Sequence, residues 1–262
     1  MMRALITAGT GMVAQQTNLD VIANNLANVN TTAFKAQRAE FHDLMYQSLT
    51  SSGAEQSGTV RAPMSKQVGL GTMFAANASN FTQGAMLSTG NPFDIAITGD
   101  GFIPVTLGDG STGYTRDGSL KRTADGTLVT SDGYEIQPQI TVPANATAFN
   151  ISPTGNVSVS VPGEDQPRLL GTIQLALFPN VSGLTRAGQN LYKSGGSSGD
   201  AVLANPTEDG AGTIQGGYLE GGNVSIVEEM VRMITAQRAY EINSKAIQTA
   251  DDMLSVLNQL KR

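Results

Sequence analysis

Residues 239–260 read AYEINSKAIQTADDMLSVLNQL, a stretch without glycine or proline in which apolar side chains recur every three or four positions. This spacing places them along one side of an α-helix. Extended upstream, the row consists of Val227, Val231, Ile234, Ala239, Ile242, Ala246, Ala250, Met253, Leu257 and Leu260. The five-residue step from Ile234 to Ala239 rotates the row around the helix, so we expect its partner to change there. A helix with such a row needs another surface to shield it from water.

A second apolar row lies at the other end of the chain. Leu5, Met12, Leu19 and Leu26 recur every seven residues, and Ala8, Ile22 and Val29 each come three residues after a member of that row. This pattern is typical of a coiled-coil seam. Because Gly9 and Gly11 weaken the first turns, we expect this helix to form only against a partner.

The sequence between the two helical ends has a different period. All 10 prolines lie between Pro63 and Pro206, and only Gly9 and Gly11 of the 30 glycines lie outside residues 53–222. Apolar and polar residues alternate in short runs, as half-buried strands do. Asp-Gly dipeptides recur at Asp100, Asp109, Asp117, Asp125 and Asp132, which suits tight turns that need a positive φ. The middle of the chain therefore reads as a series of hairpins.

Together these patterns predict an α+β fold in which long N- and C-terminal helices form a coiled-coil core and an antiparallel β-rich domain is inserted between them. We assign residues 1–33 to the N-terminal helix of the core, 34–88 to an extended connector, 89–218 to a β-rich outer domain and 219–262 to the C-terminal helix of the core. Gly221 and Gly222 are expected to act as a hinge ahead of that helix.

The composition excludes several classes of protein. A net charge of −6 argues against a nucleic-acid groove, which needs a basic surface to replace counterions. No apolar run approaches the length of a membrane span, and the first residues lack the continuous apolar region of a secretory signal. The absence of cysteine excludes disulfides, thiolate catalysis and cysteine metal sites.

Two short motifs match functional patterns by their letters alone. Residues 108–113 read GDGSTG, which fits a dinucleotide loop, but a strand and turn follow where the phosphate would need a helix N-terminus. Residues 195–199 read GGSSG, which fits a nucleophile elbow, but they lie in a low-complexity stretch far from His42, the single histidine. The aspartates match no calcium-loop spacing. We therefore predict a hairpin turn at residues 108–113 and a flexible surface loop at residues 195–199, with no catalytic residue, no cofactor and no metal site.

Several longer stretches resemble the signature segments of the bacterial flagellar basal-body rod and hook proteins. Residues 19–35 read LDVIANNLANVNTTAFK, and residues 237–245 read QRAYEINSK. Further matching stretches are EEM at 228–230, MI at 233–234, DDML at 251–254, TGNPFDIAI at 89–97, GF at 101–102, YTRDGS at 114–119 and GTLVT at 126–130. The resemblance runs the length of the chain.

This resemblance implies a structural subunit rather than an enzyme. It implies self-assembly into the distal part of the flagellar rod, a hollow, straight, helical drive shaft that transmits torque from motor to hook. In such proteins both terminal helices form the inner coiled-coil layer. The expected subunit interface consists of Leu5, Met12, Leu19, Ile22, Leu26, Val29, Val227, Val231, Ile234, Ala239, Ile242, Ala246, Ala250, Met253, Leu257 and Leu260. The family-motif residues are Asn24, Asn25, Asn28, Asn30, Phe34, Gln237, Arg238, Tyr240 and Glu241.

The partners implied by the resemblance are further copies of the chain, proximal rod and hook subunits, the periplasmic and outer-membrane bushing rings, and the flagellar export apparatus. Nucleic acid is not among them, and no membrane span is expected. The implied location is the flagellar basal body, in the rod that spans the periplasm, after export without a cleavable signal peptide.

Three alternatives stay open at this point. The chain could be a proximal rod or hook subunit of the same family. It could be an extracellular β-rich hydrolase or adhesin, although no convergent cluster of carboxylates or histidine is visible in the sequence. It could also be a monomeric binding module, since an intramolecular helical hairpin would shield both apolar rows without polymerisation.

Overall fold

The structure is a computed structural model that describes residues 2–50, 55–57, 60–61, 65–163 and 166–260. The chain divides into two compact units. The helical unit comprises Met1–Ala27, Gln37–Ser79 and Ser225–Arg262, and the β unit comprises Asn28–Ala36 and Asn80–Val224. The chain therefore passes from one unit to the other four times. Residues 28–36 belong to the β unit although helical-unit segments flank them on both sides.

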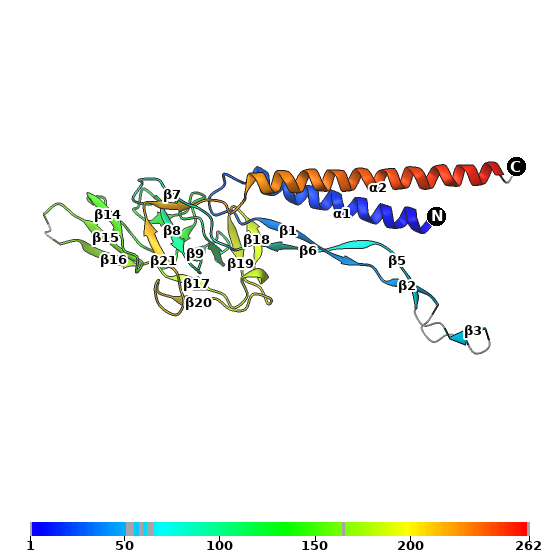
Figure 1. Cartoon of the computed structure of the whole chain (residues 1–262). Helices are drawn as coiled ribbons and strands as arrows, with labels where there is room; N and C mark the ends of the chain where they lie inside the picture. The colour runs from blue at the N-terminus through cyan, green and yellow to red at the C-terminus, as the bar shows by residue number, and fades with distance from the viewer. Residues whose placement is uncertain (1, 51–54, 58–59, 62–64, 164–165, 261–262) are drawn as a thin grey trace. The chain divides into compact units, whose positions relative to one another are not determined.

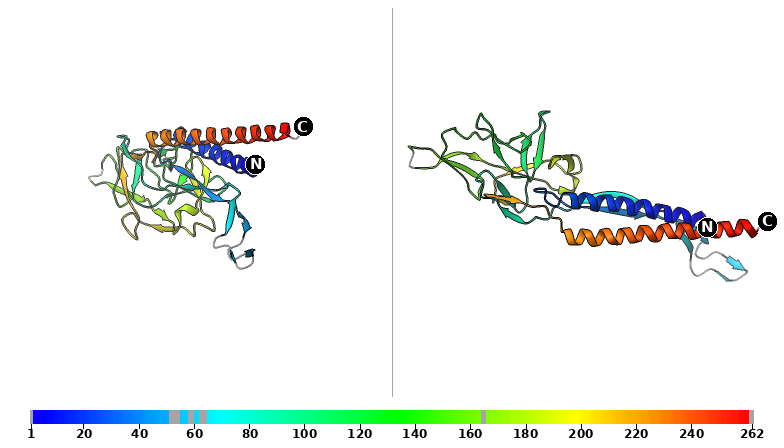
Figure 2. Two further views of the ribbon diagram at one scale, coloured as in Figure 1. Left: turned by 45° about the vertical axis from the view of Figure 1, so that its right-hand side comes forward. Right: turned by 90° about the horizontal axis from the view of Figure 1, so that it is seen from above.

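The helical unit is built on two helices that lie side by side. Helix α1 spans Met2–Ala27 and helix α2 spans Ile226–Leu260. Figure 1 draws α1 in blue along the orange-to-red α2, and Figure 2 shows the same pairing from two other directions. Helix α2 is uninterrupted because its 35 residues contain no glycine or proline. The prediction of a helix at each end is confirmed.

A long antiparallel ribbon completes the helical unit. Strand β1 (Gln37–Asp43) pairs with β6 (Thr72–Ser79), and β2 (Tyr46–Thr50) pairs with β5 (Lys66–Gly69). The short strands β3 (Glu55–Ser57) and β4 (Val60–Arg61) also pair. Helix α1 packs against β1 and β6. The segment expected to be an extended connector therefore contains paired strands, because β1 and β6 satisfy each other's main-chain groups.

The β unit consists of small antiparallel sheets. The largest has seven strands in the order β11-β12-β13-β9-β10-β19-β18, and a three-stranded sheet has the order β14-β15-β16. Three two-stranded sheets, β17-β20, β21-β8 and β22-β7, also belong to the β unit. The strands are β7 Met86–Ser88, β8 Ile95–Thr98, β9 Ile103–Thr106, β10 Thr112–Thr115, β11 Lys121–Arg122, β12 Leu128–Val129, β13 Glu135–Ile136, β14 Ala148–Ile151, β15 Asn156–Ser160, β16 Arg168–Thr172, β17 Leu175–Leu177, β18 Thr185–Gly188, β19 Leu191–Lys193, β20 Val202–Ala204, β21 Thr213–Gly216 and β22 Tyr218–Glu220, with a 3-10 helix at Val181–Gly183.

Most of the predicted Asp-Gly turns have the expected backbone. The glycines at 101, 110, 126 and 133 all adopt positive φ, as tight turns require. Gly118 differs, because its φ is not positive and a Cβ there would overlap the carbonyl oxygen of Ile95. Close backbone packing, rather than turn geometry, therefore requires glycine at position 118.

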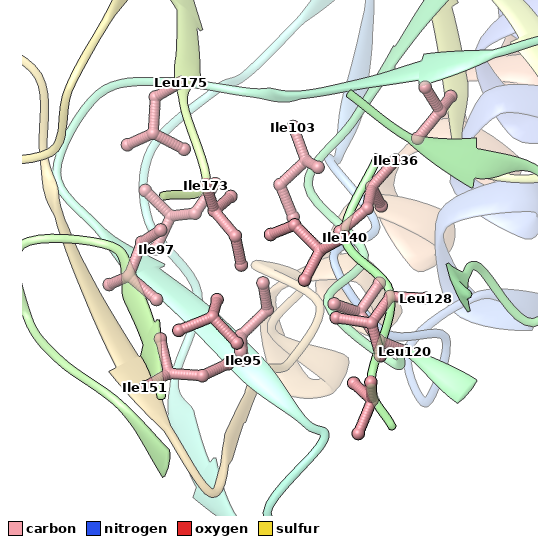
Figure 3. Packing of buried hydrophobic residues seen from close by; sticks show 14 of the residues in the cluster. Ile95, Ile97, Ile103, Leu120, Leu128, Ile136, Ile140, Ile151, Ile173 and Leu175 are labelled. Carbon is pink, nitrogen blue, oxygen red and sulfur yellow. The ribbon is translucent and has the colours of Figure 1, made fainter. Parts of the chain in front are cut away.

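The β unit has an aliphatic core and a smaller aromatic one. In Figure 3, Ile95, Ile97, Ile103 and Ile173 converge with other branched side chains from several strands, and they are fully buried. The aromatic cluster contains Phe102, Tyr114, Phe178 and Tyr192 together with Ala176 and Leu184. These cores lie within residues 81–214 and include no residue from the 28–36 segment.

Candidate subunit interface and buried charge cluster

Helix α2 has one side that is shielded from solvent within its own chain. Glu229, Ala236 and Ala250 are buried and Asn243 is half-buried, so shielded positions recur every seven residues. Half-buried Met233, Ile247 and Leu254 follow three of these positions by four residues. A Cβ on Gly11 of α1 would lie 2.9 Å from the Asn243 side-chain nitrogen, which places this polar side chain in the contact between the helices.

Away from that side, α2 carries large apolar side chains that the chain leaves uncovered. Val227 is 73% exposed, Ile242 66% and Met253 56%. Because each residue turns an α-helix by about 100°, Val227 lies opposite to Ala236, while Ile242 lies about 120° and Met253 about 100° around the helix from it. We call this the outward face of α2 and define it by Val227, Val231, Ile234, Ile242, Met253 and Val256. Helix α2 is thus more apolar on its exposed side than on its shielded side.

The two predicted rows have different environments. On the N-terminal row, Ile22 is buried and Leu5, Met12, Leu19, Leu26 and Val29 are half-buried within the chain. On the C-terminal row, Ala250 is buried and Ala239 half-buried, while Val227, Val231, Ile234, Ala246, Ile242 and Met253 are exposed. The side chains of Leu257 and Leu260 lie outside the described residues. Apolar periodicity found the exposed row but missed the shielded one, since Glu229 and Asn243 are polar.

A cluster of buried charges lies in the β unit. The ammonium nitrogen of Lys35 is 2.6 Å from Oε1 of Glu220, and Nε of Arg116 is 3.0 Å from Oε2 of the same carboxylate. The side chains of Lys35 and Glu220 are 0% exposed and that of Arg116 is 3% exposed. The carboxylate also accepts a 2.9 Å hydrogen bond from the Gly84 N–H. Each charge is therefore paired, as burial requires.

Backbone carbonyls complete the cluster. Lys35 Nζ donates to the Thr82 carbonyl at 2.8 Å, and Arg116 Nη2 donates to the Gly99 carbonyl at 2.9 Å. Two cations thus share one carboxylate. Burial lowers the pKa of Lys35 below its ordinary 10.5 and the positive charge of Arg116 lowers it further, while Glu220 opposes both effects.

Burial shifts the pKa of Glu220 in one direction, and its charged and hydrogen-bonding neighbours shift it in the other. Burial alone raises the pKa of this carboxyl, but the charge of Arg116 and the hydrogen bonds from Lys35 and the Gly84 N–H together lower it below the ordinary value of 4.5. The cluster therefore favours an ionised Glu220. Sequence reasoning did not find these three residues as a group, because Lys35 and Glu220 are 185 positions apart.

The glycines ahead of α2 are packed closely rather than arranged as a free hinge. A Cβ at Gly84 would overlap the Gly221 carbonyl oxygen, and a Cβ at Gly222 would lie 3.0 Å from the Val29 carbonyl oxygen. Neither Gly221 nor Gly222 has a positive φ. Close approach of three backbone segments accounts for these glycines, so the expected hinge role is not needed to explain them.

The described residues offer little for ligand chemistry. Among them no three His, Cys, Asp or Glu side chains gather as a metal site would require, and no helix is long and apolar enough to cross a membrane. Residues 108–113 form the β9–β10 hairpin, where Leu107 N–H donates to the Ser111 carbonyl. In residues 195–199 the Ser198 hydroxyl bonds to its own loop at Gly195. The hairpin turn predicted at residues 108–113 is confirmed, and residues 195–199 form a loop.

Comparison with known proteins connects these features. Residues 5–35 match the family model described as flagella basal body rod protein, residues 96–159 match the flagellar hook protein FlgE/F/G D1 domain, and residues 215–260 match the flagellar basal body rod FlgEFG protein C-terminal model. The chain is 50% identical to the flagellar basal-body rod protein FlgG of Borreliella burgdorferi over 264 residues, covering 100% of both chains. The chain belongs to the flagellar basal-body rod protein family.

Two further relatives are similar to this chain over their full lengths. The FlgG protein of Caulobacter vibrioides is 47% identical, with 99% of this chain and 100% of the relative aligned, and that of Bacillus subtilis is 40% identical with both chains fully covered. A flagellar rod protein is a structural subunit of the basal body, and this chain is one. Each of the three matched segments contributes one member of the charge cluster: Lys35, Arg116 and Glu220.

The family-motif residues of the N-terminal segment have mainly structural contacts. Buried Asn25 donates to the Gln37 carbonyl at 2.8 Å and accepts from the Gln37 N–H at 2.9 Å, so it joins α1 to the start of β1. Asn28 accepts hydrogen bonds from Thr31. Phe34 is buried with the Arg186 guanidinium 5.4 Å from its ring centre. The exposed motif residues are Asn24, Asn30, Gln237, Arg238, Tyr240 and Glu241.

Proposed function

We propose that this rod subunit polymerises into the distal rod through the outward face of α2. The observation that carries the proposal is that most of the large apolar side chains of α2 are exposed, away from the positions that its own chain shields. A single-chain helical hairpin would be complete with one covered side, so it leaves Val227, Ile242 and Met253 unexplained. Large apolar side chains left exposed on one face of a helix are typical of a protein interface.

Burial of the outward face against another copy would contribute a substantial free energy to association. Fully burying a large aliphatic side chain yields roughly 1.5 to 3 kcal/mol. The six residues of the outward face are already about half covered, so their complete burial would yield on the order of 5 to 10 kcal/mol before ordering entropy is subtracted. Because this face differs from the surface it would contact on another copy, the contact is heterologous and repeats without closing, which gives a helical filament.

In the assembled rod we propose that both terminal helices form a coiled-coil inner layer and that the β unit faces outward. The seven-residue recurrence of Glu229, Ala236, Asn243 and Ala250 supports the coiled-coil pairing of the helices. The rod would be hollow and straight and would transmit torque from motor to hook, acting mechanically rather than as an enzyme. Its partners would be proximal rod and hook subunits, the periplasmic and outer-membrane rings and the flagellar export apparatus.

Sedimentation over a concentration series tests the proposal. We expect the wild-type protein to form polymers as its concentration rises and Ile242→Asp to remain monomeric, because the new carboxylate would be buried without a partner. Gln248→Asp is the matched control, since it adds the same charge at an exposed position of α2 that lies about 120° around the helix from Ile242. Equal polymerisation by both variants, or a wild-type protein that stays monomeric at every concentration, would reject the outward face as the interface.

The position along the rod needs a separate experiment. The relatives named FlgG favour the distal rod over a proximal rod or hook position. Imaging of an epitope-tagged copy in purified basal bodies should place it in the outer part of the rod. A tag found only at the inner-membrane end or in the hook would exclude the distal position while leaving the interface on α2 unaffected.

A further inference from the structure

Residues 28–36, which we call the strap, make a series of polar bonds with the rest of the β unit. The Ala33 N–H donates to the Glu220 carbonyl at 2.8 Å, and the Ala36 N–H donates to Oδ1 of Asn223 at 2.7 Å. The Asn80 N–H donates to the Ala36 carbonyl at 2.8 Å. The strap thus uses its main chain as an added strand does, although no strand of the sheets includes it.

Side chains of the β unit hold the strap from a second direction. Arg186 Nη2 donates to the Lys35 carbonyl, and its guanidinium lies over the Phe34 ring. Asn190 Nδ2 donates to the Thr32 carbonyl at 3.2 Å. Lys35 itself reaches the carboxylate of Glu220. Removing the Lys35 side chain would therefore remove the ion pair between the strap and Glu220.

The β unit does not depend on the strap for its cores. The aliphatic and aromatic clusters contain no strap residue, and the buried apolar side chains that the strap supplies are Ala33 and Phe34. If the strap leaves, Glu220 keeps Arg116 and the Gly84 N–H, so one carboxylate faces one cation. Opening therefore leaves no buried charge without a partner.

The closed strap also carries costs that opening would relieve. Lys35 is fully desolvated and shares its carboxylate with a second cation, and the cost of desolvation offsets part of what this buried ion pair contributes to stability. Ala33 adopts a φ of 55°, a left-handed conformation unfavourable for a residue with a Cβ. The closed and open states are accordingly closer in free energy than the number of bonds suggests.

We propose that the strap is a latch, held closed by the bonds that Lys35 makes with Glu220 and Arg186 makes with the strap, which opens and closes as one element while the rest of the β unit stays folded. Closing it ties the end of α1 and the start of β1 to the β unit, since the strap connects them along the chain. The chain also passes between the two units at residues 79–80 and 224–225, where the strap has no part. Resting on the proposed function, we infer that the closed latch stiffens the subunit against twisting.

Limited trypsin digestion of the full chain tests whether the strap opens as a unit. Trypsin cleaves after Lys35, which is inaccessible while the strap is closed. We expect Arg186→Ala to accelerate cleavage after Lys35 about tenfold, which corresponds to about 1.4 kcal/mol. Arg168→Ala is the matched control, an exposed arginine on β16 of the same unit, and should leave the rate unchanged. Cleavage after buried Arg116 reports opening of the whole unit and should stay at the wild-type rate.

Hydrogen exchange provides a second variant and readout. In Lys35→Met, the amides of Ala33 and Ala36 should exchange about tenfold faster, while that of Phe102, which bonds to Ala176, stays unchanged. Lys193→Met changes an exposed lysine and serves as the control. Unchanged or slower strap exchange in Lys35→Met, or equal acceleration at Phe102, would overturn the latch. So would equal rates at Lys35 and Arg116 in the trypsin experiment.

The mechanical consequence is measured in cells. Strains carrying Arg186→Ala should swim normally in dilute medium and lose speed in viscous medium relative to Arg168→Ala strains. Equal speeds under load would overturn the mechanical role. Failure of the proposed function is distinguishable, because it would appear as absent polymerisation of the wild-type protein while the digestion and exchange results on the monomer still stand.

Discussion

Lys35 and Glu220 are 185 residues apart in the sequence, yet the ammonium nitrogen of one lies 2.6 Å from a carboxylate oxygen of the other, and neither side chain is exposed. The segment that leaves α1 and the strand that precedes α2 thus meet inside the β unit. Arg116 joins them from between β10 and β11. This contact therefore holds the segment that follows α1 beside the strand that precedes α2, within the β unit.

Removing the carboxylate should be the most damaging change at this site. Glu220→Ala leaves Lys35 and Arg116 buried without a counter-charge, and breaking a buried pair in this way costs about 3 to 5 kcal/mol. Urea unfolding should show this loss in the free energy of unfolding. Glu135→Ala, at an exposed position of β13, should change it by less than about 0.5 kcal/mol. A loss below about 1 kcal/mol in Glu220→Ala would contradict the importance of the cluster.

The cluster also predicts a pH dependence. Because the folded pKa of Glu220 lies below its ordinary value of 4.5, the unfolded chain binds a proton first as the pH falls. The stabilisation is therefore present above pH 4.5 and is lost as the pH falls below that value. Unfolding free energies measured from pH 7 to pH 3 should decline more steeply for the wild-type protein than for Glu220→Gln. Parallel curves for the two proteins would refute this assignment.

Two glycines in α1 should respond differently to the same substitution. A Cβ on Gly9 meets nothing within 4 Å, so Gly9→Ala should stabilise the helix by up to about 1 kcal/mol. A Cβ on Gly11 would lie 2.9 Å from Nδ2 of Asn243, so Gly11→Ala should stabilise less or destabilise. Thermal unfolding followed by circular dichroism compares them. Combining Gly11→Ala with Asn243→Ala should recover the missing stabilisation, and its absence would argue against this contact.

Asn25 should act through Gln37 rather than through a neighbouring subunit. Asn25→Ala removes two hydrogen bonds to the Gln37 backbone, at a cost of about 1 to 3 kcal/mol. The amide of Gln37 should then exchange faster in the monomer. Gln16→Ala, at an exposed position of the same helix, is the control. If Asn25→Ala left the monomer unchanged and weakened only polymerisation, the motif asparagine would instead belong to the subunit interface.

Local patterns in the sequence were sufficient to predict the two helices, several strands and most of the tight turns. Alternating runs predicted strands such as β8 and β15, apolar rows at helical spacing predicted α1 and α2, and Asp-Gly pairs predicted the tight turns. The ribbon of β1 and β6 was not recognised, because its alanine, asparagine and charged residues follow neither period. The shielded side of α2 was missed for a related reason, since Glu229 and Asn243 interrupt any apolar count.

The sequence by itself determined the two helical ends, the β-rich middle and membership of the rod family, because each depends on residues close together in the chain. Only the tertiary structure decided which side of α2 is covered, that Gly221 and Gly222 are packed against other backbone segments, and that Lys35, Arg116 and Glu220 share one buried site. The physical reason is that helix and strand formation depend on local spacing. The partner of a buried charge depends on how distant segments of the chain come together, and no periodicity records that.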